Sequence, residues 1–246
     1  MPIHRNKALS EIARNRGSGS GLRSVFTALV VLAAVGAIVL WCMAKWEAWQ
    51  TFQTDLGTYQ GVQIGTGKKA VLYAVGDPET VDGPEIRQAN GWGVINAMRV
   101  LPSKPLTKMT QGLGTLPPGK SVLDYDSWNY YSDDSQMAVR FDEQTALVKS
   151  VSCFVGWVAP AQPCDAPFGL RDDMTEEEVR RTLGKPDKEE VNGGGVLEGA
   201  PIEVTKTLYY DTIGLRLSFA KRKVDYIGKV APTGDTSNWF VRHLLL

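Results

Sequence analysis

Residues 25–44 read VFTALVVLAAVGAIVLWCMA and contain no charged side chain over 20 consecutive positions. At a rise of about 1.5 Å per residue, a helix of this length matches the hydrocarbon core of a bilayer, which is about 30 Å thick. Its many Val, Leu, Ile and Phe residues favour insertion and outweigh the single Gly36. The sequence therefore predicts a transmembrane helix over residues 25–44.

Charge on either side of this stretch predicts its orientation. Residues 1–24 hold five Lys or Arg side chains and one Glu, whereas only Lys45 follows closely on the other side. The positive-inside rule places such a basic tail in the cytoplasm and residues 45–246 outside, which for a bacterial inner membrane is the periplasm. A cleaved signal peptide is the alternative, but the apolar stretch exceeds the usual 7–15 residues and no A-x-A site follows it.

Three tryptophans lie near the outer end of the predicted span. Amphipathic rings prefer the headgroup region of a bilayer, so we expect them to be membrane-interface residues. Residues 45–60 can continue the helix outward as a stalk, until Gly57 and Gly61 interrupt it. The interface tryptophans are Trp41, Trp46 and Trp49.

Composition argues against several classes of function. Beyond residue 24, the chain carries 22 basic and 26 acidic side chains, and such an acidic body is a poor partner for nucleic acid. The two histidines, His4 and His243, lie close to the chain ends, so we expect neither imidazole catalysis nor a histidine metal site. Calcium-loop, phosphate-loop and nucleophile motifs with the required spacing are also missing, and the acidic clusters are more typical of solvated turns than of paired catalytic carboxylates, so the sequence predicts no metal, no cofactor and no enzymatic activity.

An internal repeat organises the region beyond the stalk. Residues 61–78 and residues 169–186 align without a gap at an offset of 108 and match at six positions, two of them as Val/Leu pairs and the others identical, including a Gly and a Pro at the end of each copy. In the second copy, Thr175 and Glu178 form a capping-box pattern and Gly184 stops the helix. A repeat of this kind predicts two copies of one supersecondary unit.

Short β-rich runs follow each predicted helix and indicate a three-stranded antiparallel meander. We therefore predict an α+β protein with two tandem units, residues 61–155 and residues 169–246, joined by a linker over residues 156–168. The first copy is longer between Pro78 and its aligned Tyr131 than the second is between Pro186 and Tyr210, which predicts an insertion over residues 79–124. The expected strands are residues 127–131, 137–141 and 147–154, then 204–210, 215–219 and 224–227.

Alternation along these strands divides their side chains between two faces. We expect Leu208, Tyr210 and Leu217 to face the helix, together with Tyr131, Val139 and Phe141 of the first copy. Aromatic and Arg side chains dominate protein-binding hot spots, so the opposite face and Trp92 of the insertion are the predicted partner-binding positions. On that opposite face the prediction places Trp128, Tyr130, Arg140, Tyr209 and Arg216.

Cys153 and Cys164 enclose the linker between the two units. Outside the cytoplasm two nearby cysteines are expected to pair, so we predict a disulfide that closes the linker. The spacing is not the C-x-x-C of a redox pair. The apolar tail, residues 238–246, reads NWFVRHLLL and needs cover, either from its own domain or from a partner.

The second copy resembles the SmpA/OmlA domain, the domain of the BamE lipoprotein of the outer-membrane barrel-assembly machinery. The resemblance rests on GLRDDMTEEEVRRTLGKPD (residues 169–187) and TLYYDTIGLRLSFAKRKVDYI (residues 207–227), and it covers residues 165–230 well and residues 57–155 more loosely. It implies a helix packed on a meander in a non-catalytic envelope module. The tandem form is similar in design to the beta-lactamase inhibitor protein, which grips a partner with a concave sheet.

These features lead to two functional hypotheses. The first is a non-catalytic, membrane-anchored envelope protein that binds other proteins, as a scaffold or accessory subunit of an envelope or inner-membrane complex. The second is a protein inhibitor or small-ligand receptor that uses the concave face of the tandem sheets. Both hypotheses include the lipid bilayer as a partner and exclude nucleic acid.

Overall fold

The computed structural model divides into two compact parts, residues 1–50 and residues 51–246, and each is described by itself. Among the described residues, every strand lies within residues 51–246, where a disulfide joins Cys153 to Cys164. The structure describes residues 18–83, 98–108, 110–131, 135–155, 164, 167–171, 174–192, 195–197, 200–202, 205–220 and 223–242.

A single helix, α2 (Ser18–Gly57), contains the apolar stretch and continues through most of the predicted stalk. Every side chain from residue 25 to residue 44 is exposed. Within the described residues this helix is long and apolar enough to cross a membrane, with a mean hydropathy of 2.6 over its best 18-residue window. An apolar surface all around a helix is what a bilayer would cover.

The larger part, residues 51–246, is built on one mostly antiparallel sheet. Among the described residues it contains ten strands in the order β5-β4-β3-β6-β7-β8-β14-β13-β12-β9. Two small hairpins stand apart from it, β1 (Thr58–Tyr59) with β2 (Val62–Gln63) and β10 (Gly195–Leu197) with β11 (Ala200–Ile202). The bounds are β3 (Thr80–Asp82), β4 (Arg99–Val100), β5 (Gly114–Thr115), β6 (Ser127–Tyr131), β7 (Ser135–Phe141), β8 (Val148–Val155), β9 (Lys188–Asn192), β12 (Thr205–Tyr210), β13 (Leu215–Ala220) and β14 (Lys223–Val230).

The sequence repeat is also a structural repeat. Helices α3 (Lys68–Val75) and α5 (Glu176–Leu183) begin and end at positions 108 residues apart, and each is stopped by a glycine with positive φ, Gly76 and Gly184. In the second copy the predicted capping box of Thr175 and Glu178 is present. The two copies therefore adopt the same local structure.

Hydrogen bonds and strand irregularities repeat as well. Tyr130 donates its hydroxyl to the carbonyl of Gly76, and Tyr210 does the same to Gly184, both at 3.1 Å. The ladder shifts register at Arg140/Phe141 in β7 and at the equivalent Ser218/Phe219 in β13. The tyrosine equivalent to Tyr210 is therefore Tyr130, and the alignment of Tyr131 with Tyr210 is wrong by one residue.

Each unit has a fourth strand that the meander prediction missed. Directly after each helix, β3 pairs with β6 and β9 pairs with β12. Because β3 has a counterpart, β9, in the second copy, it is not part of an insertion, and the additional segment of the first copy begins after Asp82. Within that segment the described residues include β4, β5 and the 3-10 helix η2 (Val122–Asp124).

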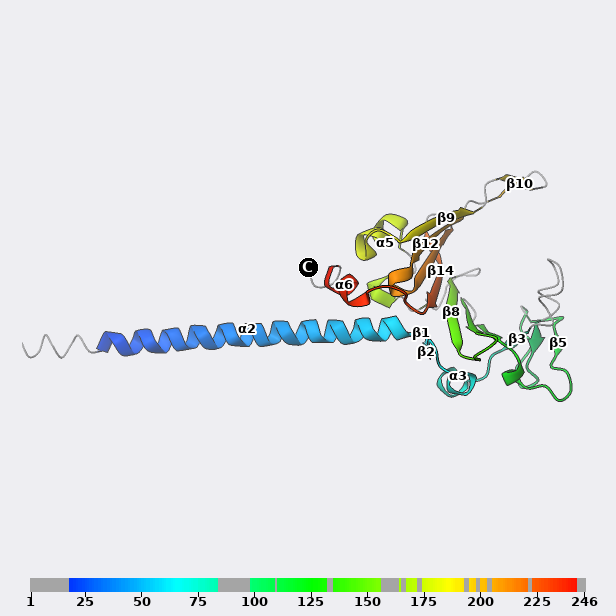
Figure 1. Cartoon of the computed structure of the whole chain (residues 1–246), viewed down its shortest axis with the longest axis horizontal. Coiled ribbons are helices and arrows are strands. Elements are labelled where there is room, and N and C mark those ends of the chain that lie inside the picture. The colour runs from blue at the N-terminus through cyan, green and yellow to red at the C-terminus, as the bar shows by residue number, and fades with distance from the viewer. Residues whose placement is uncertain are drawn as a thin grey trace, which may run out of the picture. The chain divides into compact units, whose positions relative to one another are not determined.

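The two repeat units, both within residues 51–246, share one continuous sheet. Strands β8 and β14, the last strand of each unit, pair antiparallel from Tyr226↔Phe154 to Val230↔Ser150. Figure 1 shows β8 beside β14, and α5 and α6 (Thr236–Phe240) on one side of β12 and β14. Two similar units joined through their last strands give the sheet an approximate twofold arrangement.

The described part of the apolar tail packs on its own domain. Trp239 stacks on Phe52 with ring centroids 5.6 Å apart, and Phe240 lies 4.9 Å from the same ring. Phe168 completes the cluster at 5.7 Å from Phe52. The intramolecular cover expected for the tail is present for Trp239 and Phe240, while residues 243–246 lie outside the described residues.

A pair of glycine substitutions tests how closely the end of β14 approaches Gly214. Gly214 has φ of 65° after the 3-10 helix η4 (Asp211–Ile213), and a Cβ there would lie 2.2 Å from the carbonyl oxygen of Val230. Gly65 also has positive φ, 82°, but a Cβ there meets nothing within 4 Å. We expect Gly65→Ala to cost about 1–2 kcal/mol from backbone strain alone and Gly214→Ala about 3 kcal/mol or more, measured by denaturant unfolding. Equal losses would contradict the close approach of β14 to Gly214.

Candidate functional site

Strand register decides which side chains share each face of the joined sheet. One row runs Tyr209↔Arg216↔Gly228↔Ser152↔Ala138, from β12 through β13, β14 and β8 to β7. These positions alternate with Leu208, Leu217 and Ile227, which are buried on the helix face. We call the opposite side the open face and define it by Arg140, Phe154, Tyr209, Arg216 and Tyr226.

The open face is basic and aromatic in the second unit. The Tyr209 ring lies between two cations, with Lys188 Nζ 5.2 Å and Arg216 Cζ 5.4 Å from its centroid. Its hydroxyl donates to Glu190 Oε2 at 2.6 Å, and Glu190 also pairs with Lys188. That hydrogen bond raises the pKa of Tyr209, while the hydrogen bond from Lys188 lowers the pKa of Glu190. Arg216 stays exposed, so its guanidinium is held in place and still faces solvent.

An aromatic pair lies where the two units join. Phe154 of β8 and Tyr226 of β14 are ladder partners with ring centroids 4.8 Å apart, and Phe154 is 39% exposed. Gly228 leaves room for the Tyr226 ring, because a Cβ there would lie 2.6 Å from its hydroxyl oxygen. Sequence reasoning missed this pair because it compares strands within a unit, and the pair forms only across the β8–β14 junction.

Arg140 lies on the open face of the first unit, as predicted, and is exposed. It lines an open, polar cleft of about 560 Å³ together with Asp126, Phe141, Asp142, Glu143, Gln144, Lys149 and Ser150. Nearby open-face positions are small and polar, since Ser127, Asn129 and Ser152 are buried there. The face therefore changes from polar in the first unit to aromatic and basic in the second.

Two predicted binding residues lie on the wrong face. Trp128 pairs with Val139 and Tyr130 with Met137, so both face the helix side. Trp128 is fully buried, donates its indole N–H to the carbonyls of Val122 and Tyr125, and meets Phe141 edge-on at 4.6 Å. Tyr130 is bound to the end of α3, and burial raises the pKa of its hydroxyl. The alternation argument failed because it gave β6 and β7 the wrong relative register.

Trp92 lies outside the described residues. On α2, Trp41 and Trp46 are exposed and Trp49 is half-buried, and Lys45 Nζ lies 5.9 Å from the Trp41 ring centroid. Their role at a membrane interface stays a prediction.

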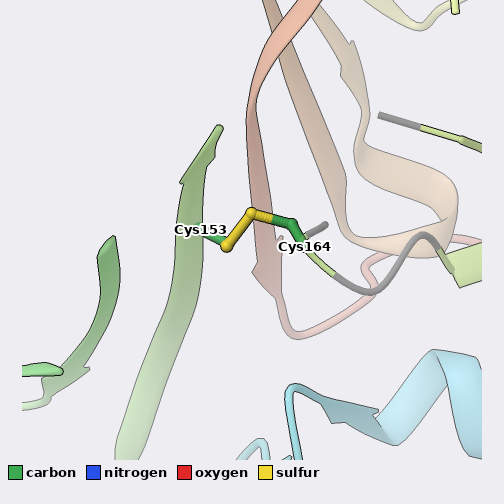
Figure 2. Close-up of a disulfide and its surroundings, with 2 residues drawn as sticks. All are labelled: Cys153 and Cys164. Atoms are coloured by element: carbon green, nitrogen blue, oxygen red, sulfur yellow. A yellow bond between two sulfur atoms is a disulfide. The ribbon is translucent and has the colours of Figure 1, made fainter. Parts of the chain in front are cut away.

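The predicted disulfide is present. Cys153 and Cys164 are bonded, with their Cα atoms 6.0 Å apart, and Figure 2 shows the bridge leaving β8 beside the neighbouring strand. Both residues are buried. The bond fastens the linker to the helix side of the sheet, next to Ile227 of β14.

Metal-ligating side chains do not cluster in the described residues. Among them, no group of three or more His, Cys, Asp and Glu side chains could hold a metal ion. Comparisons with protein-family models, with curated proteins and with solved structures find no match to the chain.

The corrected position of Trp128 makes it a core residue. We expect Trp128→Ala to destabilise the fold by about 3–5 kcal/mol, as for other buried aromatic truncations. Arg216→Ala, on the exposed face, should unfold close to the wild-type midpoint. Denaturant unfolding monitored by circular dichroism compares the two, and a Trp128 variant as stable as wild type would contradict the burial.

Removal of the disulfide should also lower the free energy of unfolding. A loop closed over a separation of 11 residues contributes about 3 kcal/mol in the chain-entropy model. Cys153→Ala with Cys164→Ala should lower the unfolding free energy by about this amount, while Cys42→Ala, which removes an exposed free thiol on α2, should not. A non-reducing gel of protein from native membranes shows whether the bond forms in the cell.

Proposed function

We propose that this protein is a non-catalytic scaffold or accessory subunit, anchored in the bacterial inner membrane, that binds another protein through the open face. The observation that carries the proposal is the Tyr209 cluster, in which an exposed Arg216 is held on an aromatic ring beside further exposed aromatic area. Tyr and Arg are, with Trp, the residues that most often dominate binding energy at protein interfaces. A fixed guanidinium also loses less entropy when it pairs with a carboxylate.

Two features support a periplasmic location for the sheet. The basic residues before α2 favour a cytoplasmic N-terminus, so residues 45–246 would lie outside. A structural disulfide such as Cys153–Cys164 persists in oxidising compartments and is rare in the cytoplasm. In this topology α2 would tether the sheet to the membrane.

The repeated architecture supports the tandem BamE-like interpretation. A helix that ends at a positive-φ glycine and packs on antiparallel strands recurs in both units. Such a module acts by binding and bracing other proteins, which agrees with the proposed role. The same resemblance favours the second candidate, an inhibitor or small-ligand receptor, for which the polar cleft beside Arg140 offers a specific site.

Recovery of partners from native membranes tests the open face. We expect Tyr209→Ala and Arg216→Ala in the tagged full chain to reduce the amount of a stoichiometric co-purifying membrane protein at least tenfold, because each removes a hot-spot side chain. Quantitative mass spectrometry after mild detergent extraction measures the change.

The matched control is Tyr73→Ala, which removes the 95% exposed tyrosine of α3 on the helix side. The amount of partner that co-purifies with Tyr73→Ala should equal the amount that co-purifies with wild type. Loss of the partner with Tyr73→Ala and not with the open-face variants would refute the choice of face. A partner retained by the fragment 45–246 but lost on Arg140→Ala would favour the inhibitor or receptor function.

A further inference from the structure

Lys229 of β14 is a lysine in the interior of the fold. Its side chain is fully buried on the helix face, between the ladder neighbours Val151 and Leu215. The ammonium group donates to the carbonyl of Ile213 in η4 and lies 4.9 Å from the centroid of the Phe168 ring. Burial of a charged amine is unfavourable unless its surroundings compensate, so this position requires an explanation.

The end of α2 supplies the opposite charge. Asp55 lies two residues before the end of that helix, and its carboxylate accepts a hydrogen bond from the backbone N–H of Phe168 at 2.7 Å. The same carboxylate attracts Lys229 electrostatically. Three segments that are far apart in sequence therefore meet around one amine: the last turns of α2, the 3-10 helix η3 (Pro167–Gly169) and η4.

The internal repeat provides a control for this position. Lys229 pairs with Leu215 as Cys153 pairs with Met137, so the two residues occupy equivalent places in their units. Cys153 is bonded covalently to Cys164, whereas Lys229 makes only reversible contacts. The strand position itself does not call for a lysine, and an apolar side chain would avoid the cost of burying a charge.

We infer that Lys229, Asp55 and Phe168 form a protonation-dependent latch that holds the end of α2, residues 52–57, against the shared sheet. The disulfide fastens the linker permanently, and the latch fastens the helix end reversibly. This inference does not depend on the proposed binding function of the open face.

The protonation of Lys229 determines the direction of the pH effect. Burial lowers its pKa to about 7, and the carboxylate of Asp55 opposes this shift. Among the described residues packed around the amine, Val151, Leu215 and Phe168 are apolar, Ile213 presents a carbonyl, and Asp55 is the charged group that acts on it. If the helix end detaches, water reaches the amine and its pKa returns toward the ordinary lysine value of 10.5.

Proton binding by Lys229 couples closing of the helix end to pH. Between pH 7 and pH 10.5 the open state binds a proton that the closed state lacks, so closing becomes more favourable as pH rises. Below pH 7 the amine is charged in both states and the dependence levels off. The latch is therefore tightest at alkaline pH and loosens as pH falls toward neutrality.

Hydrogen exchange of the full chain in nanodiscs tests the latch. The readout is the protection factor, corrected for intrinsic exchange, of the amides of residues 52–57 and of Phe168. We expect protection at pH 9 to exceed that at pH 7 at least about tenfold in wild type. Lys229→Met should remove this difference, because the buried side chain no longer titrates.

Two further variants keep the test decisive. Lys223→Met removes an exposed lysine from the same strand and should leave the pH dependence as in wild type. Asp55→Asn removes the carboxylate that favours the charged amine, so the loss of protection should continue below pH 7 toward pH 6. Equal protection at pH 7 and pH 9 in wild type, or an unchanged pH dependence in Lys229→Met, would overturn the latch.

Discussion

The pairing of β8 with β14 is the interaction on which the rest of residues 51–246 depends. Each repeat alone is a four-stranded sheet with one helix on it, and its last strand would be an exposed edge. The antiparallel contact removes both edges at once and creates one long sheet. It also brings Phe154 and Tyr226 together and places Cys153 beside Ile227. The open face and the disulfide-closed linker both follow from this junction.

Local signals in the sequence predicted the elements of the fold well. The helix α5 is defined by Thr175, Glu178 and Gly184, each of which acts on its own backbone or its near neighbours, and all three behave as expected. The apolar run of α2 and the short separation of Cys153 from Cys164 are equally local. Five of the six predicted strands match within two residues, and the sixth, in β14, extends three residues further.

The faces and the buried polar groups were less predictable because they depend on register and on distant segments. Trp128 and Val139 share a face only because of how β6 and β7 pair, and alternation within one strand cannot supply that pairing. Strand β9 reads KEEVN, and its charged residues do not show the apolar alternation by which a strand is predicted. It is an edge strand, and its Glu189 pairs with Arg180 of α5. Nothing near Lys229 in the sequence indicates that Asp55, 174 positions earlier, lies close to it.

The most direct test of this account is whether β8 and β14 behave as interior strands. Residue-resolved hydrogen exchange of the full chain should show the amides of Tyr226–Val230 and of their partners in β8 as strongly protected as those of β7 and β13. The edge strand β9 provides the internal reference for weak protection. If β8 and β14 exchanged as fast as β9, the two units would be separate sheets, and the continuous open face would not exist.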